Sequence, residues 1–346
     1  MVTSSARGEW LLVAALTLAL TLLVPAAGGP TTASTQPAAR ETTSVNGMRV
    51  IAISLDGLSP RALVRLGRAG APHLHRMLTT GAGTLNARTQ VELTVTLPNH
   101  TSIVTGRRIA AAHGGHGVTW NDHLSGTTVH GAARAPVSSV FSVVKAGGGS
   151  TAVFATKRKF SLFDRSWPAE IDRSVIREED DAAATRAMRR DFLARARSFV
   201  LLHLGLADRV GHARGWMSPA YLRAVMRLDR LVGSVMRMVR GHPRLRRSTV
   251  VVLTADHGGV PGQRRHSDAR SRENYRVPFV IWGRGVADAG LYRLNPSRKW
   301  PGRTRPGFAG RQPIRNGDLA NLATDILGLG PVADSLWNHD QRLAWR

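Results

Sequence analysis

The sequence predicts an α/β fold in which helices cover both faces of a mostly parallel central sheet. From residue 48 onward, short apolar runs rich in β-branched residues alternate with longer helical stretches. These short runs have no polar face, and continuous apolar runs are typical of parallel strands that are buried on both sides. The predicted strands are residues 50–55, 151–154, 199–202, 250–253 and 277–282.

Helical stretches lie between these runs and after the last of them. No internal repeat and no shift in composition divides this part of the chain, so residues 48–346 are predicted to form a single domain. A segment rich in Arg, Pro and Gly, residues 285–315, is predicted to be a long surface excursion before the last helix. The predicted helices are residues 60–68, 99–104, 137–145, 182–197, 219–239 and 318–327.

The composition indicates a chain with a sizeable core. Its 346 residues are 42% hydrophobic, which nearly excludes intrinsic disorder. The absence of Cys excludes disulfides, a Cys-ligated zinc site and a Cys nucleophile. The net charge of +25 favours anionic substrates or envelope polymers through long-range attraction. The basic residues are dispersed rather than gathered beside aromatic residues, so no specific nucleic-acid binding is expected.

The N-terminus has the pattern of a targeting segment. An unbroken apolar stretch covers residues 10–24, and small residues and Pro25 follow it. Residues 1–28 are therefore predicted to be a secretory signal peptide or an uncleaved N-terminal membrane anchor. Residues 29–47, rich in Thr, Ser, Pro and Ala, are predicted to be a disordered linker. Both interpretations place the folded part outside the cytoplasmic membrane, as a secreted or cell-envelope protein.

Carboxylates and histidines gather where the predicted strands end. In open α/β sheets, ligands bind beyond the carboxyl ends of the strands. Asp208 and His212 converge there if the backbone turns between them, which Gly211 permits. A set of Asp and His without Cys suits Zn²⁺ best, with Mn²⁺ or Ca²⁺ less well suited. The candidate ligands are Asp56, Asp208, His212, Asp256, His257 and His266.

Each of these elements also has a purely structural interpretation. Asp56 followed by Gly is a common turn or helix cap, and the triplet that begins at Asp256 fits a loop with a capping histidine. His203 lies in an apolar run and is interpreted as a packed, hydrogen-bonded histidine. The convergence of three acidic strand ends and three histidines at one edge of one sheet favours the metal site.

Thr96 is the candidate nucleophile. Pro98 and Asn99 predict a helix whose N-terminus faces the strand ends, which would place Thr96 at the positive end of the helix dipole. Beside a cation, a hydroxyl at this position can be held as an alkoxide that attacks phosphorus. The alternatives are that residues 96–99 form only a turn that leads into a helix, or that Thr94 is the nucleophile.

The ordered set of motifs resembles the alkaline phosphatase superfamily and, within it, the type I phosphodiesterase/nucleotide pyrophosphatase family. The resemblance extends over residues 49–330, most of the predicted mature chain, and implies a three-layer α/β sandwich. The matching segments are residues 53–57, 96–100, 116–121, 208–212 and 256–259, together with His266.

The resemblance implies two divalent metal ions, Zn²⁺ in the first place and Mn²⁺ as an alternative. The first would be bound by Asp56, Asp256 and His257, and would bind the Thr96 oxygen. The second would be bound by Asp208, His212 and His266. Thr96 would form a phospho-threonine intermediate, and Asn121 would donate to a non-bridging phosphoryl oxygen.

Two features depart from the nucleotide-hydrolysing pattern. Leu97 follows the nucleophile where nucleotide pyrophosphatases usually have an aromatic residue that stacks on the base, and the chain has only 5% aromatic residues. The spacing from His257 to His266 is also short, which indicates that a substrate-covering insertion is missing or lies elsewhere.

Lys157 and Lys159 are candidate substrate-binding residues. They follow the strand at residues 151–154, and related monoesterases and phosphonate hydrolases with a Thr nucleophile carry such a pair here to bind a dianionic phosphoryl group. Only four Lys occur in the chain, and two of them lie here. The alternative is a solvated basic turn.

The sequence therefore predicts a two-metal hydrolase of phosphate esters of the phosphodiesterase type. Its substrate is expected to be an anionic phosphate-ester small molecule or an envelope polymer. A phosphomonoesterase or phosphonate hydrolase of the same superfamily is the alternative, and a non-catalytic basic envelope protein that binds anionic polymers is a further one. A formylglycine sulfatase is disfavoured, because the nucleophile position holds Thr rather than Cys or Ser.

Overall fold

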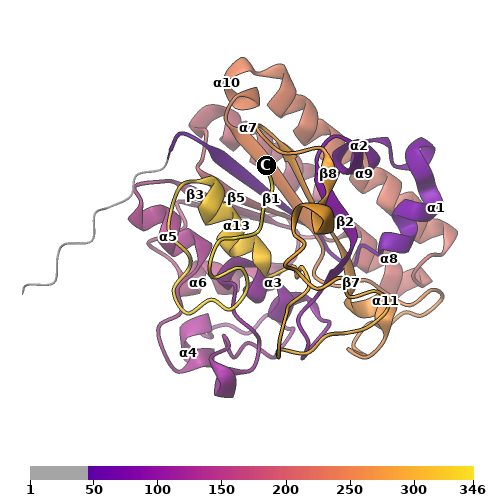
Figure 1. The fold of residues 1–346 in the computed structure, drawn as a ribbon, viewed down its shortest axis with the longest axis horizontal. Coiled ribbons are helices and arrows are strands. Elements are labelled where there is room, and N and C mark those ends of the chain that lie inside the picture. Colours follow the sequence, from indigo (N-terminus) through magenta and orange to yellow (C-terminus); the bar gives the residue numbers. More distant parts are fainter. Residues whose placement is uncertain (1–45) are drawn as a thin grey trace, which may run out of the picture. The chain divides into compact units, whose positions relative to one another are not determined.

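The computed structural model describes residues 46–346, and the predicted signal segment and nearly all of the predicted linker lie outside the described residues. The described residues are built around one eight-stranded sheet with strand order β4-β3-β5-β1-β6-β7-β2-β8 (Figure 1). The strands are β1 (Arg49–Leu55), β2 (Ala82–Arg88), β3 (Thr151–Ala155), β4 (Arg173–Ile176), β5 (Phe199–Leu204), β6 (Thr249–Thr254), β7 (Arg276–Gly283) and β8 (Ala289–Gly290).

The strands from β4 to β6 along the sheet are all parallel, and every residue of β5 and β6 is buried. The predicted fold class is therefore confirmed. One strand runs against the others, because β7 is antiparallel to both β6 and β2. A continuous apolar run indicates burial on both faces for parallel and antiparallel strands alike. The sequence pattern therefore did not predict the direction of β7.

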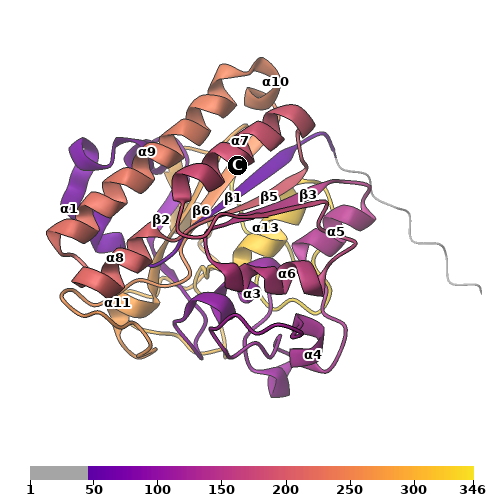
Figure 2. The ribbon, with the colours of Figure 1, turned by 180° about the vertical axis from the view of Figure 1, so that it is seen from behind.

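One layer of helices, in front in Figure 2, contains α1 (Pro60–Gly70), α2 (Pro72–Thr79), α7 (Asp181–Arg195), α8 (Leu206–Arg214) and α9 (Pro219–Gly241). The opposite layer, in front in Figure 1, contains α3 (Thr96–Thr105), α5 (Val140–Ala146) and α13 (Asp318–Ile326). Local sequence explains where α9 begins: Pro219 is in its first turn and the Ser218 side chain accepts a hydrogen bond from Tyr221 N. The result is a three-layer α/β sandwich.

The six predicted helices are all present, but several shorter elements were not predicted. Strands β2, β4 and β8 were missed, as were helices α2 and α8. The remaining short elements are α4 (Val129–Ala133), α6 (Ser161–Ser166), α10 (Pro243–Arg246), α11 (Arg272–Tyr275), α12 (Leu291–Leu294), and the 3-10 turns η1 (Ala111–His113) and η2 (Arg158–Phe160). Most of these span one or two turns, which is too short to show a helical period.

Two fully buried arginines form hydrogen bonds with the predicted surface excursion at residues 285–315. Arg88 donates to the carbonyl oxygens of Gly302 and Thr304, each at 3.0 Å. Arg315 donates to Pro306 O at 2.7 Å and to Thr89 O at 2.9 Å. Among residues 46–346, no helix has the length and apolar character needed to cross a bilayer.

Candidate active site

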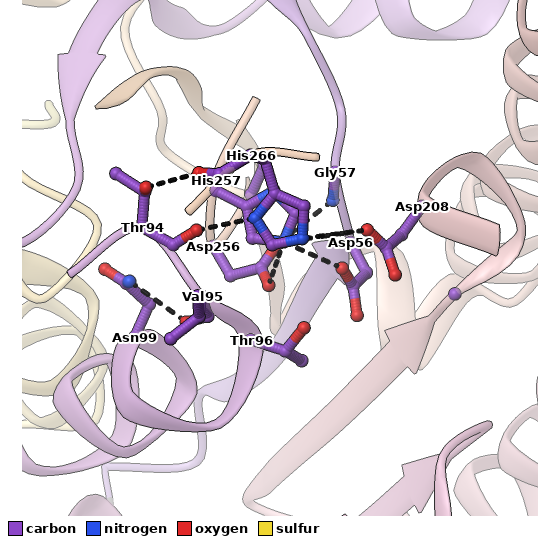
Figure 3. Close-up of polar contacts among 12 residues, drawn as sticks. Asp56, Gly57, Thr94, Val95, Thr96, Asn99, Asp208, Asp256, His257 and His266 are labelled. Carbon is purple, nitrogen blue, oxygen red and sulfur yellow. Dashed lines mark hydrogen bonds and ion pairs between the residues drawn. The ribbon is translucent and has the colours of Figure 1, made fainter. Parts of the chain in front are cut away.

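The three central strands bring the predicted ligands to one edge of the sheet. Strand β1 lies between β5 and β6, with Leu55 beside Leu204 and Ser54 beside Thr254. Asp56 follows β1 directly, Asp208 lies in the first turn of α8 after β5, and Asp256 follows β6. Figure 3 shows these three carboxylates directed toward the stacked imidazole rings of His257 and His266.

The loop expected around Gly211 is instead helix α8. Asp208 and His212 are four residues apart on that helix and therefore share one face, with the carboxylate Oδ1 3.3 Å from His212 Nε2. The φ angle of Gly211 does not lie in the left-handed region. Glycine is required there because a Cβ atom would lie 2.7 Å from the Trp216 ring.

Two clusters of ligand atoms meet at His257. In the first, His257 Nε2 lies 3.4 Å from Asp56 Oδ1 and 3.3 Å from Asp256 Oδ2. In the second, Asp208 Oδ1 lies 3.7 Å from His257 Nε2 and 3.6 Å from His266 Nε2. His212 completes the second cluster, because its Nε2 lies 3.2 Å from that of His266.

The hydrogen bonds of the three histidines leave their Nε2 lone pairs facing the clusters. The Nδ1 atoms of His212, His257 and His266 lie 2.7, 2.9 and 2.6 Å from the backbone oxygens of Arg264, Gly258 and Thr94. A carbonyl oxygen only accepts, so each Nδ1 carries a proton, and in the neutral ring the Nε2 lone pair is free for a metal. This is the arrangement in which imidazole binds a metal through Nε2.

The aspartates are arranged in the same way, with one oxygen held by the protein and the other free. Asp256 Oδ1 accepts from Gly57 N at 3.1 Å, Asp56 Oδ2 lies 2.9 Å from His203 Nε2, and Asp208 Oδ2 lies 2.6 Å from Lys157 Nζ. Of the buried side-chain atoms that have no hydrogen-bond partner among the described residues, four belong to these ligands and face the clusters: Asp56 Oδ1, Asp208 Oδ1, Asp256 Oδ2 and His257 Nε2.

These residues fit a pair of divalent cations. Ligands bound about 2.0 Å from a tetrahedral metal lie about 3.3 Å from one another, which is the spacing found here. Buried polar atoms without partners are costly, and the two cations together would satisfy all four. The mixed oxygen and nitrogen ligands agree with the predicted chemistry, and they do not identify the metal.

Thr96 is the first residue of α3 and is buried beside the clusters (Figure 3). Its Oγ1 lies 3.4 Å from Lys157 Nζ. The alternative nucleophile, Thr94, has a structural role. Its Oγ1 donates to His266 O at 2.5 Å, and its backbone oxygen accepts from His266 Nδ1. Thr94 therefore holds a candidate metal ligand in place, and Thr96 is the hydroxyl that faces the site.

Asn121 is half-buried and lies at the N-terminus of α3. Its Oδ1 accepts a hydrogen bond from Leu97 N at 2.9 Å, which satisfies a backbone donor of the first helical turn. The contact fixes the orientation of the amide and leaves Nδ2 as a donor beside Thr96. The contact of Asn121 with a phosphoryl oxygen, which the resemblance implies, stays a prediction.

The two predicted substrate-binding lysines have different surroundings. Lys157 Nζ lies 2.6 Å from both Asp56 Oδ2 and Asp208 Oδ2, and its side chain is 15% exposed. Lys159 is in η2, is partly exposed, and forms no hydrogen bond or ion pair with the described residues. Burial, followed by the nearby Lys157 ammonium, lowers the pKa of Lys159.

The carboxylates of the site have opposite pKa shifts. Burial alone would raise the pKa of Asp56, but the Lys157 ammonium, the hydrogen bond from His203 and the nearby His257 ring hold it well below its ordinary value. Burial, reinforced by the charge of Asp56, raises the pKa of Asp256 to about 8. Burial lowers the pKa of His257, but the surrounding aspartates outweigh it and raise the value to about 9. Perturbed pairs of this kind are typical of functional sites.

Four residues that support the site were not predicted as part of it. His203 holds Asp56, in agreement with its interpretation as a packed, hydrogen-bonded histidine. His100 Nδ1 contacts Thr96 O at 2.8 Å, while its Nε2 contacts Ser54 Oγ at 2.7 Å. Trp216 Nε1 and Tyr221 OH both donate to Gly57 O, at 3.0 and 2.7 Å. None follows a strand end, so position in the sequence gave no signal for these roles.

A family model described as type I phosphodiesterase / nucleotide pyrophosphatase matches residues 50–275, which contain every predicted site residue. The chain belongs to this family. Membership confirms the predicted resemblance, including its place in the alkaline phosphatase superfamily. Family and fold together indicate an enzyme of the phosphoester hydrolase type.

Solved structures show the same fold. Murine ectonucleotide pyrophosphatase/phosphodiesterase 5, in an inactive form in complex with AMP, superposes with a TM-score of 0.63 at 14% identity, covering 86% of this chain and 100% of that one. The lipoteichoic acid synthase LtaP from Listeria monocytogenes superposes with a TM-score of 0.60 at 13% identity, covering 86% of this chain and 77% of that one.

Sequence relatives include two proteins named GPI ethanolamine phosphate transferase 1. The Neurospora crassa protein is 31% identical over 146 residues, which cover 39% of this chain and 14% of that protein. The Chaetomium globosum protein is 31% identical over 172 residues, which cover 46% of this chain and 18% of that protein. The matches thus span less than a fifth of the length of these relatives.

Proposed function

We propose that this chain is a two-metal phosphodiesterase with Thr96 as its nucleophile. The observation that carries the proposal is the position of Thr96, which begins α3 and lies beside two clusters of unpartnered ligand atoms. Asp56, Asp256 and His257 would hold one divalent ion, and Asp208, His212 and His266 the other. The two ions would supply positive charge that favours an ionised Thr96 oxygen and neutralises the leaving oxygen.

The residues of the chain then have separate tasks. The Thr96 oxygen forms a bond to phosphorus as the bond from phosphorus to the alcohol oxygen breaks, and one proton passes in total from Thr96 to that alcohol. Water next breaks the bond between phosphorus and Thr96, which releases a phosphate monoester and restores the hydroxyl. Asn121 Nδ2 and the N-terminus of α3 stabilise the charge on the phosphoryl oxygens.

The leaving group is proposed to lack a nucleobase. Leu97 occupies the position after the nucleophile, and its side chain is fully buried in the core, where no substrate ring can stack on it. We therefore propose an anionic phosphodiester with an aliphatic alcohol, either a small molecule or an envelope polymer. The apolar segment at residues 10–24 supports the proposal that the enzyme acts outside the cytoplasmic membrane.

The proposal is tested with bis-p-nitrophenyl phosphate and p-nitrophenyl phosphate, each with Zn²⁺ and with a chelator. We expect zinc-dependent turnover that favours the diester and that falls at least about 10³-fold in Thr96→Ala. Thr101→Val is the matched control and should retain turnover, because the Thr101 hydroxyl donates only to Leu97 O within α3. Faster turnover of the monoester would assign a phosphomonoesterase, and full activity of Thr96→Ala would overturn the proposed nucleophile.

A second candidate is transfer of the phosphoryl group to an alcohol instead of water. It is favoured by the relatives, which are named as transferases, and by LtaP, which is named as a synthase. Adding glycerol to the diester reaction and following the products by ³¹P NMR separates the two. A new glycerol phosphodiester that increases with glycerol concentration would indicate a transferase, whereas the monoester alone would indicate a hydrolase.

A further inference from the structure

Lys157 lies between the two candidate metal clusters rather than at the substrate side of one of them. Its Nζ atom is 2.6 Å from Asp56 Oδ2, which belongs to a residue of the first cluster. It is also 2.6 Å from Asp208 Oδ2, which belongs to a residue of the second. A single ammonium group thus connects an aspartate of each cluster.

The contacts leave the metal-facing oxygens free. Lys157 contacts the Oδ2 atom of each aspartate, whereas the unpartnered Oδ1 atoms are the ones that face His257, His212 and His266. The ammonium and a pair of cations are therefore compatible, because they use different oxygens of the same carboxylates. Lys157 therefore fixes the orientation of both carboxylates through the oxygens that do not face the clusters.

The third contact of Lys157 is with the proposed nucleophile. Its Nζ donates to Thr96 Oγ1 at 3.4 Å, so three acceptors face the three N–H donors of the ammonium group. None of its donors is left for a phosphoryl oxygen while these contacts are made. Lys159, which has no such partners, is the lysine of the pair that remains available to the substrate.

Charge explains why a cation is needed at this position. Asp56, Asp208 and Asp256 are buried within one site, and buried carboxylates repel one another strongly unless positive charge is nearby. Among residues 46–346, the Lys or Arg side chain that forms ion pairs with Asp56 and Asp208 is Lys157. Its ammonium then remains beside Thr96 Oγ1, where negative charge develops when the hydroxyl ionises.

We propose that Lys157 is a built-in third cation of the site, which holds the carboxylates of both metal clusters in place before metals bind and stabilises the ionised Thr96 oxygen during the reaction. This assignment replaces substrate binding as the role of Lys157 and leaves that role to Lys159 and Asn121. Only its second half, the stabilisation of the ionised Thr96 oxygen, rests on the proposed function. The structural part is independent of the reaction.

The test compares Lys157→Met, Lys157→Gln and Lys159→Met, each purified with Zn²⁺ and then measured with chelator or with saturating Zn²⁺. Without metal, both Lys157 variants should melt about 5–10 °C below the wild type, because uncompensated carboxylates remain buried. Zn²⁺ should raise their Tm more than it raises that of the wild type. Lys159→Met should melt like the wild type in both states.

Kinetics with bis-p-nitrophenyl phosphate provide the second measurement. In the zinc-loaded Lys157 variants, kcat should fall about 10²-fold with little change in KM, whereas Lys159→Met should mainly raise KM. An unchanged metal-free Tm in both Lys157 variants would overturn the proposal. A lowered Tm with wild-type kcat would overturn the proposed stabilisation of the ionised Thr96 oxygen. If the wild type turned over no phosphate ester, the proposed function would fail, while the Tm comparison would still decide the role of Lys157 in the metal-free site.

Discussion

The Nε2 atoms of His212 and His266 lie 3.2 Å apart, and in the neutral rings both present a lone pair to the second cluster. Both rings donate through Nδ1, His212 to Arg264 O and His266 to Thr94 O. Two nitrogen lone pairs at this distance repel each other unless a cation lies between them. The pair is thus the clearest sign that the second cluster is built for a metal.

Removal of metal should destabilise the protein. A chelator is expected to lower the Tm, and stoichiometric Zn²⁺ to restore it, because ions that bind only the folded state stabilise it. His266→Ala removes one ligand of the second cluster, so bound metal measured by mass spectrometry should fall from about two ions per chain to about one. A Tm that is insensitive to both chelator and Zn²⁺ would contradict a metal site.

Asn121→Asp should impair the reaction without loosening α3. The aspartate still accepts from Leu97 N, but it lacks the N–H donor and adds negative charge beside the phosphoryl group. The loss of one such donor costs about 10²–10³-fold in kcat. Steady-state kinetics with bis-p-nitrophenyl phosphate and the Tm measure both effects. Unchanged kcat would show that Asn121 only caps the helix.

The metal-free protein should lose stability as the pH rises from about 7 to 9. The pKa of Asp256 is raised from 3.8 to about 8 and that of His257 from 6.5 to about 9, so the folded state binds protons that the unfolded state has released. This stabilisation is complete below the unfolded pKa values and is lost as the pH passes the folded ones. The lowered pKa values of Asp56 and Asp208, and those of the buried histidines His100, His116, His203 and His266, act below this range.

Melting curves with chelator between pH 7 and pH 9 measure this effect. The Tm should fall with pH in the chelated protein and change much less in the zinc-loaded protein, since metal binding has already displaced the protons. A Tm of the chelator-treated protein that rises across the whole range would contradict this prediction.

Gly211→Ala should destabilise the protein and displace His212. The added Cβ would lie 2.7 Å from the Trp216 ring, and overpacking of this kind costs about 1–3 kcal/mol. Gly241→Ala at the end of α9 is the matched control, because a Cβ there meets nothing within 4 Å. Urea denaturation compares the two variants. Equal stability would show that Trp216 moves aside without cost.

The central part of the fold was predictable because its strands are buried on both faces. Strands β1, β3, β5 and β6 appear in the sequence as short apolar runs, and the candidate site residues follow shortly after each run. Strand β2, with the sequence Ala-Gly-Thr-Leu-Asn-Ala-Arg, has no such run. It forms because β7 and β8 pair with it, and such pairing is decided by distant segments.

The candidate site was predictable to the same extent. Asp56, Asp208 and Asp256 were identified from their places after strands, and the structure brings them together at adjacent strand ends. Asp208 and His212 lie together because the turn between them is helix α8, and Gly211 is needed for the close approach of Trp216 rather than for the turn. The contacts that His203 and Lys157 make with Asp56 also join residues that are more than 100 positions apart.

By itself, the sequence determined the fold class, the family and the candidate residues for the chemistry, because burial pattern and motif order are local properties of the chain. Only the tertiary structure decided which atoms of those residues are free. The Nδ1 protons are fixed by the carbonyls of Arg264, Gly258 and Thr94, and the Oδ2 atoms of Asp56 and Asp208 are occupied by Lys157. Hydrogen bonds depend on distance and direction in space, and residues far apart in the sequence supply both.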